Sequence, residues 1–358
     1  MRMISRMIGA ARMDEDRRLD GRAFLVTGGA GFIGSNFIRY MLKTYPHCRI
    51  INLDNLTYAG NLENLENIFS GDDRYEFIKG DIRDHKLVGK LIEEIYGVVH
   101  FAAETHVDRS ILDADNFVQT NVYGSYALFE AIRKSSVKIF LHVSTDEVYG
   151  SCEHGRFHEN DPLHPSSPYA ASKAGADAFA LAYIKTYDLP IVILRPSNNF
   201  GPYQYPEKFI PLFITNALEG KSLPIYGDGS HVRDWLEVED HCRAIDIILN
   251  RGKTGEVYNV CTGEERQNKE VANMILDILD KPKDLIEHVS DRLGHDRRYA
   301  MDCSKIKDLG WKPEKTFTEA LESTALWYKN HCDWWRKIRR KSFEFKEFYK
   351  TQYGKSED

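Results

Sequence analysis

A glycine-rich turn near the N-terminus constrains the fold of this chain more than any other segment. Gly28, Gly31 and Gly34 follow the apolar run Ala23–Thr27 and precede a helical pattern over residues 33–44. Glycine permits a tight turn and a close approach to the backbone, and the start of the helix offers free N–H groups to a phosphate. An ordinary glycine turn, the alternative, does not require this order of strand, turn and helix. We therefore predict a dinucleotide-binding turn at residues 28–34.

The acidic residue after the second apolar run indicates which dinucleotide is bound. Asp54 lies 20 residues beyond Gly34, directly after Arg49–Leu53, and the next residue, Asn55, carries no charge. A carboxylate at this position accepts a hydrogen bond from a ribose 2′-hydroxyl and repels a 2′-phosphate. The sequence therefore predicts NAD rather than NADP.

Short apolar runs alternate with helical patterns through the first two thirds of the chain. Near-continuous apolar strands separated by helices are typical of a parallel sheet that is covered on both faces. The rhythm changes after residue 196, because residues 198–232 are rich in Pro, Gly, Asn and Tyr. We predict an α/β protein with a Rossmann-like doubly wound parallel sheet and a smaller C-terminal α/β substrate domain. The expected strands are Ala23–Thr27, Arg49–Leu53, Tyr75–Ile78, Val98–Phe101, Ile139–Val143, Ile191–Leu194 and Glu256–Val260, and the expected helices are 33–44, 86–95, 115–135, 169–187, 208–219, 236–250, 268–280 and 315–330.

These patterns divide the chain into three parts. Residues 1–22 are rich in Arg and Met but also contain four acidic residues, so we expect a disordered extension rather than an organellar targeting peptide. Residues 23–197 are expected to form an NAD-binding Rossmann domain, to which a segment near residues 234–262 returns. Residues 198–233 and 263–358 are expected to form the substrate-binding domain.

The composition excludes some classes of partner. The chain has 358 residues and a net charge of −6 with both signs interspersed, so we expect no nucleic-acid-binding surface. It contains no run of about 18 apolar residues, so we expect no membrane-spanning helix. The 6 cysteines are widely spread without a Cys-x-x-Cys motif, which indicates reduced thiols in a cytoplasmic protein.

Two short motifs after the fifth apolar run carry groups for proton transfer. Tyr169 and Lys173 are four residues apart, so a helix places the phenol and the ammonium on one face. The ammonium is expected to lower the pKa of the phenol, which then acts as a base near neutral pH. Asp146 and Glu147 add a second acid and base, although alone they would fit the capped start of a helix. A simple alcohol dehydrogenation does not need this second pair, so we predict an oxidation coupled to an elimination.

These motifs together resemble the extended short-chain dehydrogenase/reductase family. Within it, Thr145–Gly150 is similar to the nucleotide-sugar 4,6-dehydratases, whereas relatives that only epimerise or decarboxylate generally lack the Asp-Glu pair. The resemblance runs from about residue 23 to the C-terminus. The other matching segments are Thr105–Ser110, Ser197–Tyr203, Pro206–Lys208, Tyr226–Gly229, Arg233–Trp235 and Gly294–Tyr299. Leu293, Glu237 and Cys261–Gly263 depart from the family pattern, which bears on substrate detail rather than on reaction type.

The resemblance implies a role for each of the catalytic residues Thr145, Asp146, Glu147, Tyr169 and Lys173. Tyr169 removes the proton from a sugar 4-hydroxyl, which Thr145 aligns, as hydride passes from C4 to NAD. Glu147 then removes the C5 proton, and Asp146 protonates the departing 6-hydroxyl, which leaves as water. Hydride returns to C6, so the product is a nucleotide-linked 4-keto-6-deoxy sugar and NAD is regenerated. Asp146 must therefore be protonated while Glu147 is ionised, and adjacent carboxyl groups have pKa values that move apart.

The resemblance also implies the residues that bind the cofactor and the substrate. The expected NAD-binding residues are Gly28, Gly31, Phe32, Ile33, Gly34, Asp54, Asn55, Leu56, Thr57, Asp81, Ile82, Ala102, Ala103, Thr105, Thr120, Tyr169, Lys173 and Asn199. In the substrate site, basic side chains are expected to bind the diphosphate, and other residues to contact the sugar and the nucleoside. The expected substrate-binding residues are Thr105, Thr145, Asn198, Lys208, Phe209, Pro224, Tyr226, Arg233, Asn268, Arg292, His295 and Tyr353.

Several alternatives stay open. The reaction could be an epimerisation or decarboxylation of a nucleotide sugar, or the chain could be a non-catalytic NAD-binding module. The resemblance favours dTDP-glucose, with UDP-glucose as the alternative, because the bases differ by one methyl group, worth roughly 1–3 kcal/mol. The resemblance also implies a homodimer formed by the helices near 115–135 and 169–187.

Two further clusters carry no prediction of a site. Cys152, His154, His158 and His164 lack the spacing of a zinc motif, so no metal is expected. The basic segment 336–341, beside Trp334 and Trp335, is expected to be a solvated helix face with tryptophans packed inward rather than a surface for an anionic partner.

Overall fold

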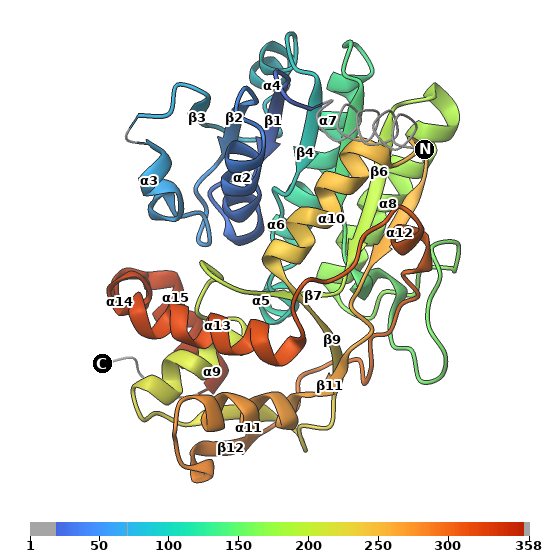
Figure 1. Ribbon diagram of the computed structural model, residues 1–358. Coiled ribbons are helices and arrows are strands. Elements are labelled where there is room, and N and C mark those ends of the chain that lie inside the picture. The colour runs from blue at the N-terminus through green and yellow to red at the C-terminus, as the bar shows by residue number, and fades with distance from the viewer. Residues whose placement is uncertain (1–18, 70, 354–358) are drawn as a thin grey trace, which may run out of the picture.

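The computed structural model describes residues 19–69 and 71–353, and it confirms an α/β fold built on a large parallel sheet (Figure 1). The strand order is β10-β6-β5-β4-β1-β2-β3, and each adjacent pair is parallel. The chain reverses its direction across the sheet between β1 and β4, which is where doubly wound sheets bind ligands. The strands are β1 (Ala23–Thr27), β2 (Arg49–Asp54), β3 (Tyr75–Lys79), β4 (Gly97–His100), β5 (Ile139–Val143), β6 (Ile191–Pro196) and β10 (Val257–Val260).

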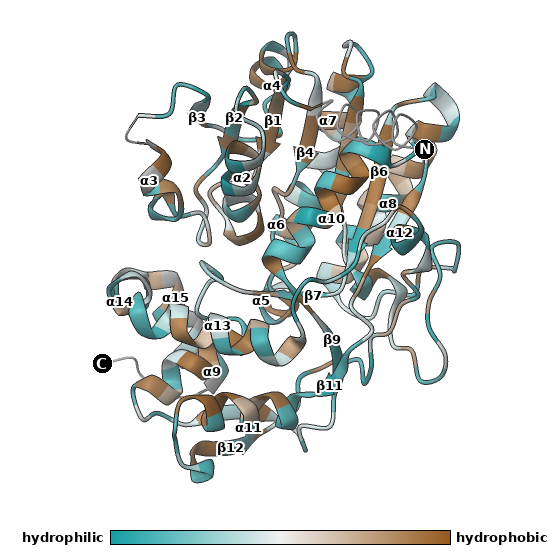
Figure 2. Cartoon of the chain, in the orientation of Figure 1, coloured by the Kyte–Doolittle hydropathy of each residue, from teal (hydrophilic) through white to brown (hydrophobic). Residues whose placement is uncertain are grey.

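Helices cover both faces of this sheet. The helices α2 (Phe32–Thr44) and α10 (Val238–Arg251) share one hydrophobic core with it. On the opposite face, α4 (His85–Leu91), α7 (Ser125–Ile132) and α8 (Pro168–Tyr187) share another. Figure 2 shows hydrophobic residues along β1, β4 and β6, as expected for strands that are buried on both sides.

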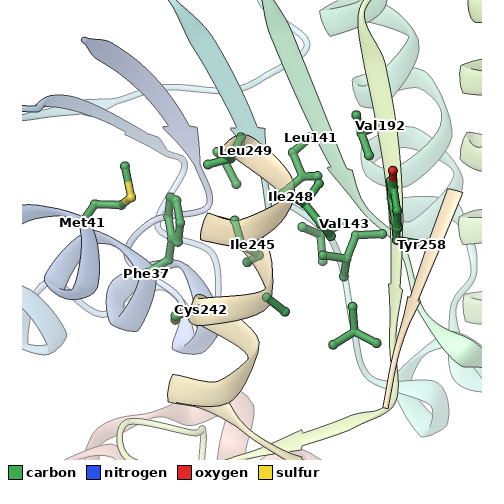
Figure 3. Close-up of a cluster of buried hydrophobic side chains, with 14 of the residues drawn as sticks. Phe37, Met41, Leu141, Val143, Val192, Cys242, Ile245, Ile248, Leu249 and Tyr258 are labelled. Carbon is green, nitrogen blue, oxygen red and sulfur yellow. The ribbon is translucent and has the colours of Figure 1, made fainter. Parts of the chain in front are cut away.

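The helix α10 belongs to a segment that returns to the large sheet late in the chain. Its Ile245, Ile248 and Leu249 are fully buried between Phe37 of α2 and Leu141 of β5 (Figure 3). Burying one such aliphatic side chain stabilises the fold by about 1.5–3 kcal/mol. The strand β10 follows α10 and pairs with β6. The returning segment therefore ties the second region of the chain to the first.

The second region contains two short sheets and its own core. The strands β7 (Asn198–Phe200), β9 (Val232–Glu237) and β11 (Glu265–Gln267) form one sheet, and β8 (Leu223–Tyr226) pairs with β12 (Ile286–Val289). Large aromatic side chains such as those of Tyr328 and Trp335 fill the core. The helices here are α9 (Phe209–Leu218), α11 (Asn268–Ile278), α13 (Phe317–Asn330), α14 (Cys332–Lys341) and α15 (Phe343–Tyr353). The domain boundaries themselves remain a prediction.

Short helical segments complete the described chain. They are η1 (Leu62–Leu65), α3 (Glu66–Phe69), α5 (Val107–Leu112), η3 (Asp146–Tyr149), η4 (Lys283–Leu285) and α12 (Ser304–Asp308). No helix within the described residues is long and apolar enough to cross a membrane.

The helix expected over residues 115–135 has a different internal structure. It consists of α6 (Asp115–Phe117), the π-helical η2 (Val118–Gly124) and α7 in succession. Hydrophobic periodicity does not distinguish a short π-helical turn from the α-helix around it, so the sequence did not indicate η2. Such wide turns often occur at functional sites, and Thr120 of η2 lines the cleft described below.

Expectations about the N-terminus and the cysteines need correction. Residues 1–18, most of the expected extension, lie outside the described residues, but Leu19 is fully buried in the first core. Ordered packing therefore begins before residue 23. Cys261, directly after β10, forms a disulfide with Cys303, directly before α12, so the expectation of reduced thiols is wrong for this pair. The two cysteines are 42 residues apart and meet only in the fold, which their spacing could not show.

Candidate active site

A cleft at the carboxyl end of the large sheet brings both regions of the chain together. Its volume is about 300 Å³. The loops after β1 to β4 line one side, and the segments after β5 and β6 line the other. All the expected NAD-binding residues except Leu56 line this cleft, as do all the expected catalytic residues. Leu56 instead turns the chain, with φ of 54° and its N–H bound to Asp54 Oδ1.

The glycine turn lets another backbone approach closely. Gly28 has φ of 71°, and a Cβ at this position would lie 2.6 Å from the backbone nitrogen of Ala102. The helix α2 begins at Phe32, and its N-cap Gly31 provides no side-chain cap. The first N–H groups of α2 are therefore open to the cleft, which Phe32 and Ile33 line. Free N–H groups and the helix dipole suit the pyrophosphate of a dinucleotide.

Asp54 and Asp81 place two carboxylates along the same side of the cleft. Asp54 Oδ2 accepts a hydrogen bond of 2.9 Å from Ala30 N, and burial raises the pKa of Asp54 despite this bond. The carboxylate retains lone pairs for a ribose hydroxyl. Asp81 forms a salt bridge of 2.7 Å with Arg83, which holds the pKa of Asp81 below its usual value. Together with the glycine turn, these residues fit NAD.

Thr145, Asp146 and Glu147 form the start of η3, immediately after β5. Thr145 is the N-cap: its Oγ1 accepts from Glu147 N over 3.3 Å and donates to Asp146 Oδ1 over 3.1 Å. The capping alternative is therefore correct only in part, because Thr145 is the N-cap and Asp146 and Glu147 both lie in the first turn. Asp146 is buried, and its Oδ2 has no hydrogen-bond partner in the described part of the chain. A buried carboxyl oxygen that is left unpaired in a cleft is available to a ligand.

The environments of Asp146 and Glu147 give the two adjacent carboxyl groups different pKa values. Burial, followed by the charge of Glu147, raises the pKa of Asp146 well above its usual value. Burial also raises the pKa of Glu147, but the nearby cations of Arg292, Arg233 and Lys208 oppose that shift. Asp146 is therefore the group that keeps its proton near neutral pH, while Glu147 ionises more easily. Both pKa values are raised, and that of Asp146 is raised further, which fits the predicted order of ionisation.

Tyr169 and Lys173 lie in the first two turns of α8, with both side chains buried. Lys173 Nζ donates to the backbone oxygen of Val143 over 2.7 Å, and burial lowers the pKa of Lys173 to about 8. Burial, followed by the charge of Glu147, raises the pKa of Tyr169. The expected lowering of the phenol pKa is therefore wrong for this arrangement. The reason is that Lys173 binds the backbone of β5, whereas Tyr169 faces carboxyl groups.

Polar residues of the second region complete the cleft on the side of the sugar. Lys208 Nζ donates to the backbone oxygen of Thr105 over 2.8 Å. Asn198 Oδ1 is buried with no hydrogen-bond partner among the described residues. Asn199 is already bound, because its Oδ1 lies 2.7 Å from His241 Nδ1. Thr105, Thr145, Asn198 and Lys208 are the expected substrate-binding residues that line the cleft.

Arg233 and Arg292 lie outside the lining of the cleft, but their charges act on Glu147. Arg233 Nη2 donates to the backbone oxygen of Asp296 over 2.9 Å. Arg292 Nη1 lies 3.9 Å from Asp108 Oδ1, and its Nε is buried without a hydrogen-bond partner in the described chain. One buried and one half-buried guanidinium group beside the cleft suit the diphosphate of a nucleotide.

The remaining expected substrate-binding residues lie beyond the cleft in the second region. Tyr226, at the end of β8, accepts a hydrogen bond of 2.6 Å from Gln352, and its ring lies 5.8 Å from that of His295. Asn268 begins α11, and its Oδ1 is buried without a partner among the described residues. Pro224 lies in β8 and Phe209 begins α9. Tyr353 ends α15, and its side chain is outside the described part of the structure.

His231, Asp291 and His295 form a polar cluster next to Tyr226. His231 Nε2 lies 3.4 Å from Asp291 Oδ2, and His295 Nδ1 lies 2.6 Å from Asp291 Oδ1. The imidazole rings stack with centroids 3.6 Å apart and an interplanar angle of 16°. One potential ligand atom of each residue lies within 4.8 Å of the others, so the cluster has the composition and spacing of a group that can hold a metal ion.

The two clusters that carried no prediction have ordinary local structures. Cys152, His154, His158 and His164 do not form a group of potential metal ligands in the described chain. The basic segment lies in α14, where Trp335 is fully buried as expected. Arg339 departs from the expected solvated face, since it is buried with Nη1 bound to Thr215 over 3.0 Å.

Two buried acids that organise the substrate side were not predicted from the sequence. Glu207 is buried and forms a salt bridge of 2.8 Å with Arg109, 98 residues away in the chain. Asp108 is also buried and lies beside both Arg292 and the hydroxyl of Tyr226. Both acids stand within the segments used for the resemblance, but only the fold shows which side chains they meet. Tyr58, Glu104 and Gln204 also line the cleft without having been predicted.

Comparisons with known proteins agree with this arrangement. The family described as GDP-mannose 4,6 dehydratase matches residues 25–324. The chain is similar to a dTDP-glucose 4,6-dehydratase of Streptomyces antibioticus, with 47% identity over 323 residues, which are 88% of this chain and 95% of that protein. It is also similar to a low-salt glycan biosynthesis protein of Haloferax volcanii, with 50% identity over 304 residues, 85% of this chain and 97% of the relative. A crystal structure of dTDP-glucose 4,6-dehydratase from Streptomyces venezuelae with NAD bound gives a TM-score of 0.86 at 48% identity, covering 88% of this chain and 99% of that one.

Proposed function

Because the chain belongs to the GDP-mannose 4,6 dehydratase family, we propose that it is an NAD-dependent dTDP-glucose 4,6-dehydratase. The enzyme is a lyase that converts dTDP-glucose to dTDP-4-keto-6-deoxyglucose and water. Relatives that carry this name at 47–49% identity over most of the chain support the choice of reaction and of nucleotide.

The observation that carries the proposal is a buried acid and a half-buried base beside a buried tyrosine in one cleft. Asp146 and Glu147 both lie near Tyr169, since their charges raise the pKa of its phenol. Oxidation of an alcohol needs the tyrosine, but loss of a 6-hydroxyl as water needs a further acid and a further base. An epimerase has no such requirement, and a binding module needs none of these groups.

Each of these residues acts on one atom of the sugar. Tyr169 takes the proton of the sugar 4-hydroxyl, which Thr145 Oγ1 holds in line. The resulting 4-ketone acidifies the C5 proton, which Glu147 removes as its carboxylate. Asp146, still protonated because burial raises its pKa, gives its proton to the departing 6-hydroxyl. Reprotonation at C5 completes the product.

NAD, when bound, supplies reversible acceptance of hydride. The turn Gly28–Gly34 and the start of α2 would hold its pyrophosphate, Asp54 the adenosine ribose and Asp81 the adenine. Lys173 would hold the nicotinamide ribose hydroxyls, and its own Nζ is positioned by the backbone oxygen of Val143. Oxidation and reduction balance within one cycle, so NAD stays bound through it.

The second region binds the nucleotide part of the substrate. Lys208, Arg233 and Arg292 pair with the diphosphate, and Thr105 and Asn198 contact the sugar. The nucleoside lies against the segment from Pro224 to Tyr226, with further contacts to Phe209, Asn268, His295 and Tyr353. Unpartnered buried atoms in this region, Asn198 Oδ1, Asn268 Oδ1 and Arg292 Nε, support these assignments.

The enzyme is a homodimer in this proposal. Large apolar side chains on η2 and α8 are exposed, with Val118 at 50%, Tyr123 at 43%, Phe179 at 41% and Tyr187 at 47% of full exposure. A second copy would bury these side chains in a symmetric interface made by the same two helical segments of each chain. Light scattering of the purified protein tests this state, and a monomer would exclude it.

The proposed location is the cytoplasm. The disulfide between Cys261 and Cys303 is unusual for a reducing compartment. Fractionation of the source cells tests the location directly.

The deciding experiment incubates the purified protein separately with dTDP-glucose and UDP-glucose, without added NAD. Formation of the 4-keto-6-deoxy product and water, followed by NMR or mass spectrometry, is expected from dTDP-glucose. Faster conversion of UDP-glucose would move the assignment to that nucleotide. Absence of product from both substrates, even after NAD is added, would exclude a 4,6-dehydratase and return the epimerase and the binding module as explanations.

A further inference from the structure

The helix α14, which precedes the last helix α15, is connected by hydrogen bonds to the glycine turn near the start of the chain. Trp334 Nε1 donates to Asn64 Oδ1 over 3.1 Å, and Asn64 lies in η1. Asn64 Nδ2 donates in turn to the backbone oxygen of Ala30 over 2.9 Å. Ala30 lies in the middle of the turn between β1 and α2. Two successive hydrogen bonds thus join the indole of α14 to the turn that holds the pyrophosphate.

With these bonds, both the N–H and the carbonyl oxygen of Ala30 have hydrogen-bond partners. The N–H of Ala30 donates to Asp54, and its carbonyl oxygen accepts from Asn61 N over 3.0 Å as well as from Asn64. Asn64 is 1% exposed, so its amide does not exchange these partners for water. With Ala30 held on both sides, the N–H groups that follow it keep one direction toward the cleft.

The surrounding contacts hold α14 and η1 against each other. Arg39 Nε donates to the backbone oxygen of Asn64 over 3.0 Å, and the guanidinium of Arg39 lies 4.8 Å from the ring centroid of Tyr203. The rings of Tyr203 and Trp334 are 5.8 Å apart. Lys337 of α14 forms an ion pair with Glu63 of η1. The hydrogen bond from Trp334 to Asn64 is therefore one of several contacts between α14 and η1. The other contacts hold its donor and acceptor in place.

We propose that Trp334 and Asn64 are positioning residues through which α14 slows the release of NAD. The inference rests on the proposed function, in which each reaction cycle regenerates NAD and no step requires its departure. Neither residue lines the cleft. They act through Ala30 by keeping the pyrophosphate-binding turn in one conformation, so their loss shortens the residence of NAD without altering the groups that move protons.

A matched pair of tryptophan variants tests the first bond. Trp334→Phe keeps an aromatic ring in α14 and removes the donor to Asn64. Trp327→Phe is the control, because Trp327 packs on the same Tyr203 at 4.7 Å and its indole nitrogen makes no hydrogen bond within the described residues. The rate of NAD dissociation is measured by exchange of the bound cofactor against isotopically labelled NAD. We expect Trp334→Phe to raise this rate about 2- to 10-fold and Trp327→Phe to leave it unchanged.

A second variant tests the bond to the turn itself. Asn64→Asp keeps an acceptor for Trp334 but removes the donor to the Ala30 carbonyl. Its NAD dissociation rate is expected to exceed that of Trp334→Phe, because the acceptor in the turn loses its side-chain partner. At saturating NAD, kcat and the KM for the sugar nucleotide are expected to stay within about 2-fold of the parent enzyme in both variants.

The outcomes separate this inference from general damage and from the proposed function. Equal NAD dissociation rates in Trp334→Phe and Trp327→Phe would overturn it. A parallel fall of kcat at saturating NAD and of the melting temperature in both Trp334→Phe and Asn64→Asp would also overturn it, since that is the pattern of a merely structural role. Cofactor exchange is observed without any sugar nucleotide, so it gives its answer even if the dehydratase assay fails.

Discussion

The two sides of the cleft are built for binding by different means. On the side of β1 to β4, the main contribution is backbone: a glycine turn, the open start of α2 and small residues after β4. On the side of the second region, the contribution is charge: Arg233 is buried, and the half-buried Lys208 and Arg292 lie near the buried acids Glu207 and Asp108. Binding on the first side requires glycines, which have no Cβ. Binding on the second side requires long charged side chains that the fold brings together. The first is therefore local in sequence and sensitive to added volume, whereas the second is non-local and sensitive to lost charge.

The largest effect is expected from adding volume on the backbone side. In Gly34→Val, the new Cβ would collide with the backbone oxygen of Gly28, so the turn cannot keep its shape. We expect no detectable NAD binding by calorimetry and no dehydration. Gly89→Ala in α4 is the control, because a Cβ there meets nothing within 4 Å. Retention of NAD by Gly34→Val would show that the turn does not depend on close packing.

The next largest effect is expected from removing the acid between the two sides. Asp146→Asn preserves shape but provides no proton for the leaving hydroxyl, and loss of a general acid costs about 10²- to 10⁴-fold in kcat. NAD binding should be unchanged. Exchange of the C5 proton with deuterated solvent should continue, because Glu147 is intact. A variant that loses this exchange together with dehydration would place Asp146 earlier in the reaction than proposed.

A smaller effect is expected from removing one charge on the substrate side. Arg292→Met keeps a side chain of similar length but provides no donor for a diphosphate, so KM should rise about 10- to 100-fold. Loss of the charge should also raise the pKa of Glu147 and so lower kcat on the acidic side. Arg297→Met is the control, because Arg297 has 61% of its side chain exposed and pairs only at the surface with Asp228. Steady-state kinetics with both variants provides the comparison. An equal change in both would assign the effect to general electrostatics.

The pH profile of kcat should report the ionisation of Glu147 and of Lys173, which lie between the two sides. Activity requires Glu147 as its carboxylate, and burial raises its pKa, so the acid limb should lie above the usual range of a glutamate. Activity also requires Lys173 as its cation, and burial lowers its pKa to about 8, so kcat should fall as the pH rises through that value. Measurement of kcat from pH 5 to about pH 10 checks this shape. A profile that stays flat beyond pH 9 would remove Lys173 from the ionisations that matter.

The smallest effect on activity is expected from removing the disulfide, which belongs to neither side of the cleft. Closing a loop of 42 residues is expected to stabilise the fold by about 2–4 kcal/mol, so Cys303→Ser should lower the free energy of unfolding by that amount with little change in kcat. Chemical denaturation measures the difference. Titration of thiols in denatured, unreduced protein should detect only the free cysteines Cys48, Cys152, Cys242 and Cys332. Detection of all the cysteines would contradict the bond.

The contrast between the sides also explains what could be predicted from sequence. The glycine turn, Asp54 and the pair Tyr169 and Lys173 follow from short spacings, and the strands follow from continuous apolar runs, so both were recognised. The pairing of Asp108 with Arg292 joins segments that only tertiary packing brings together. The direction of the Tyr169 pKa shift was wrong for a related reason, because spacing placed Lys173 near the phenol but could not reveal burial among carboxyl groups.

The late arrival of β10 in the large sheet has a consequence for synthesis of the chain. Its partner β6 is complete at residue 196, but β10 ends about 60 residues later, at Val260. At roughly 5–20 residues per second, a ribosome needs roughly 3–12 s to make that interval. During this time the outer edge of β6 has no neighbour and offers unpaired N–H and C=O groups to any passing strand. The nascent protein is therefore most prone to aggregation during this interval. The interval ends when β10 pairs with β6.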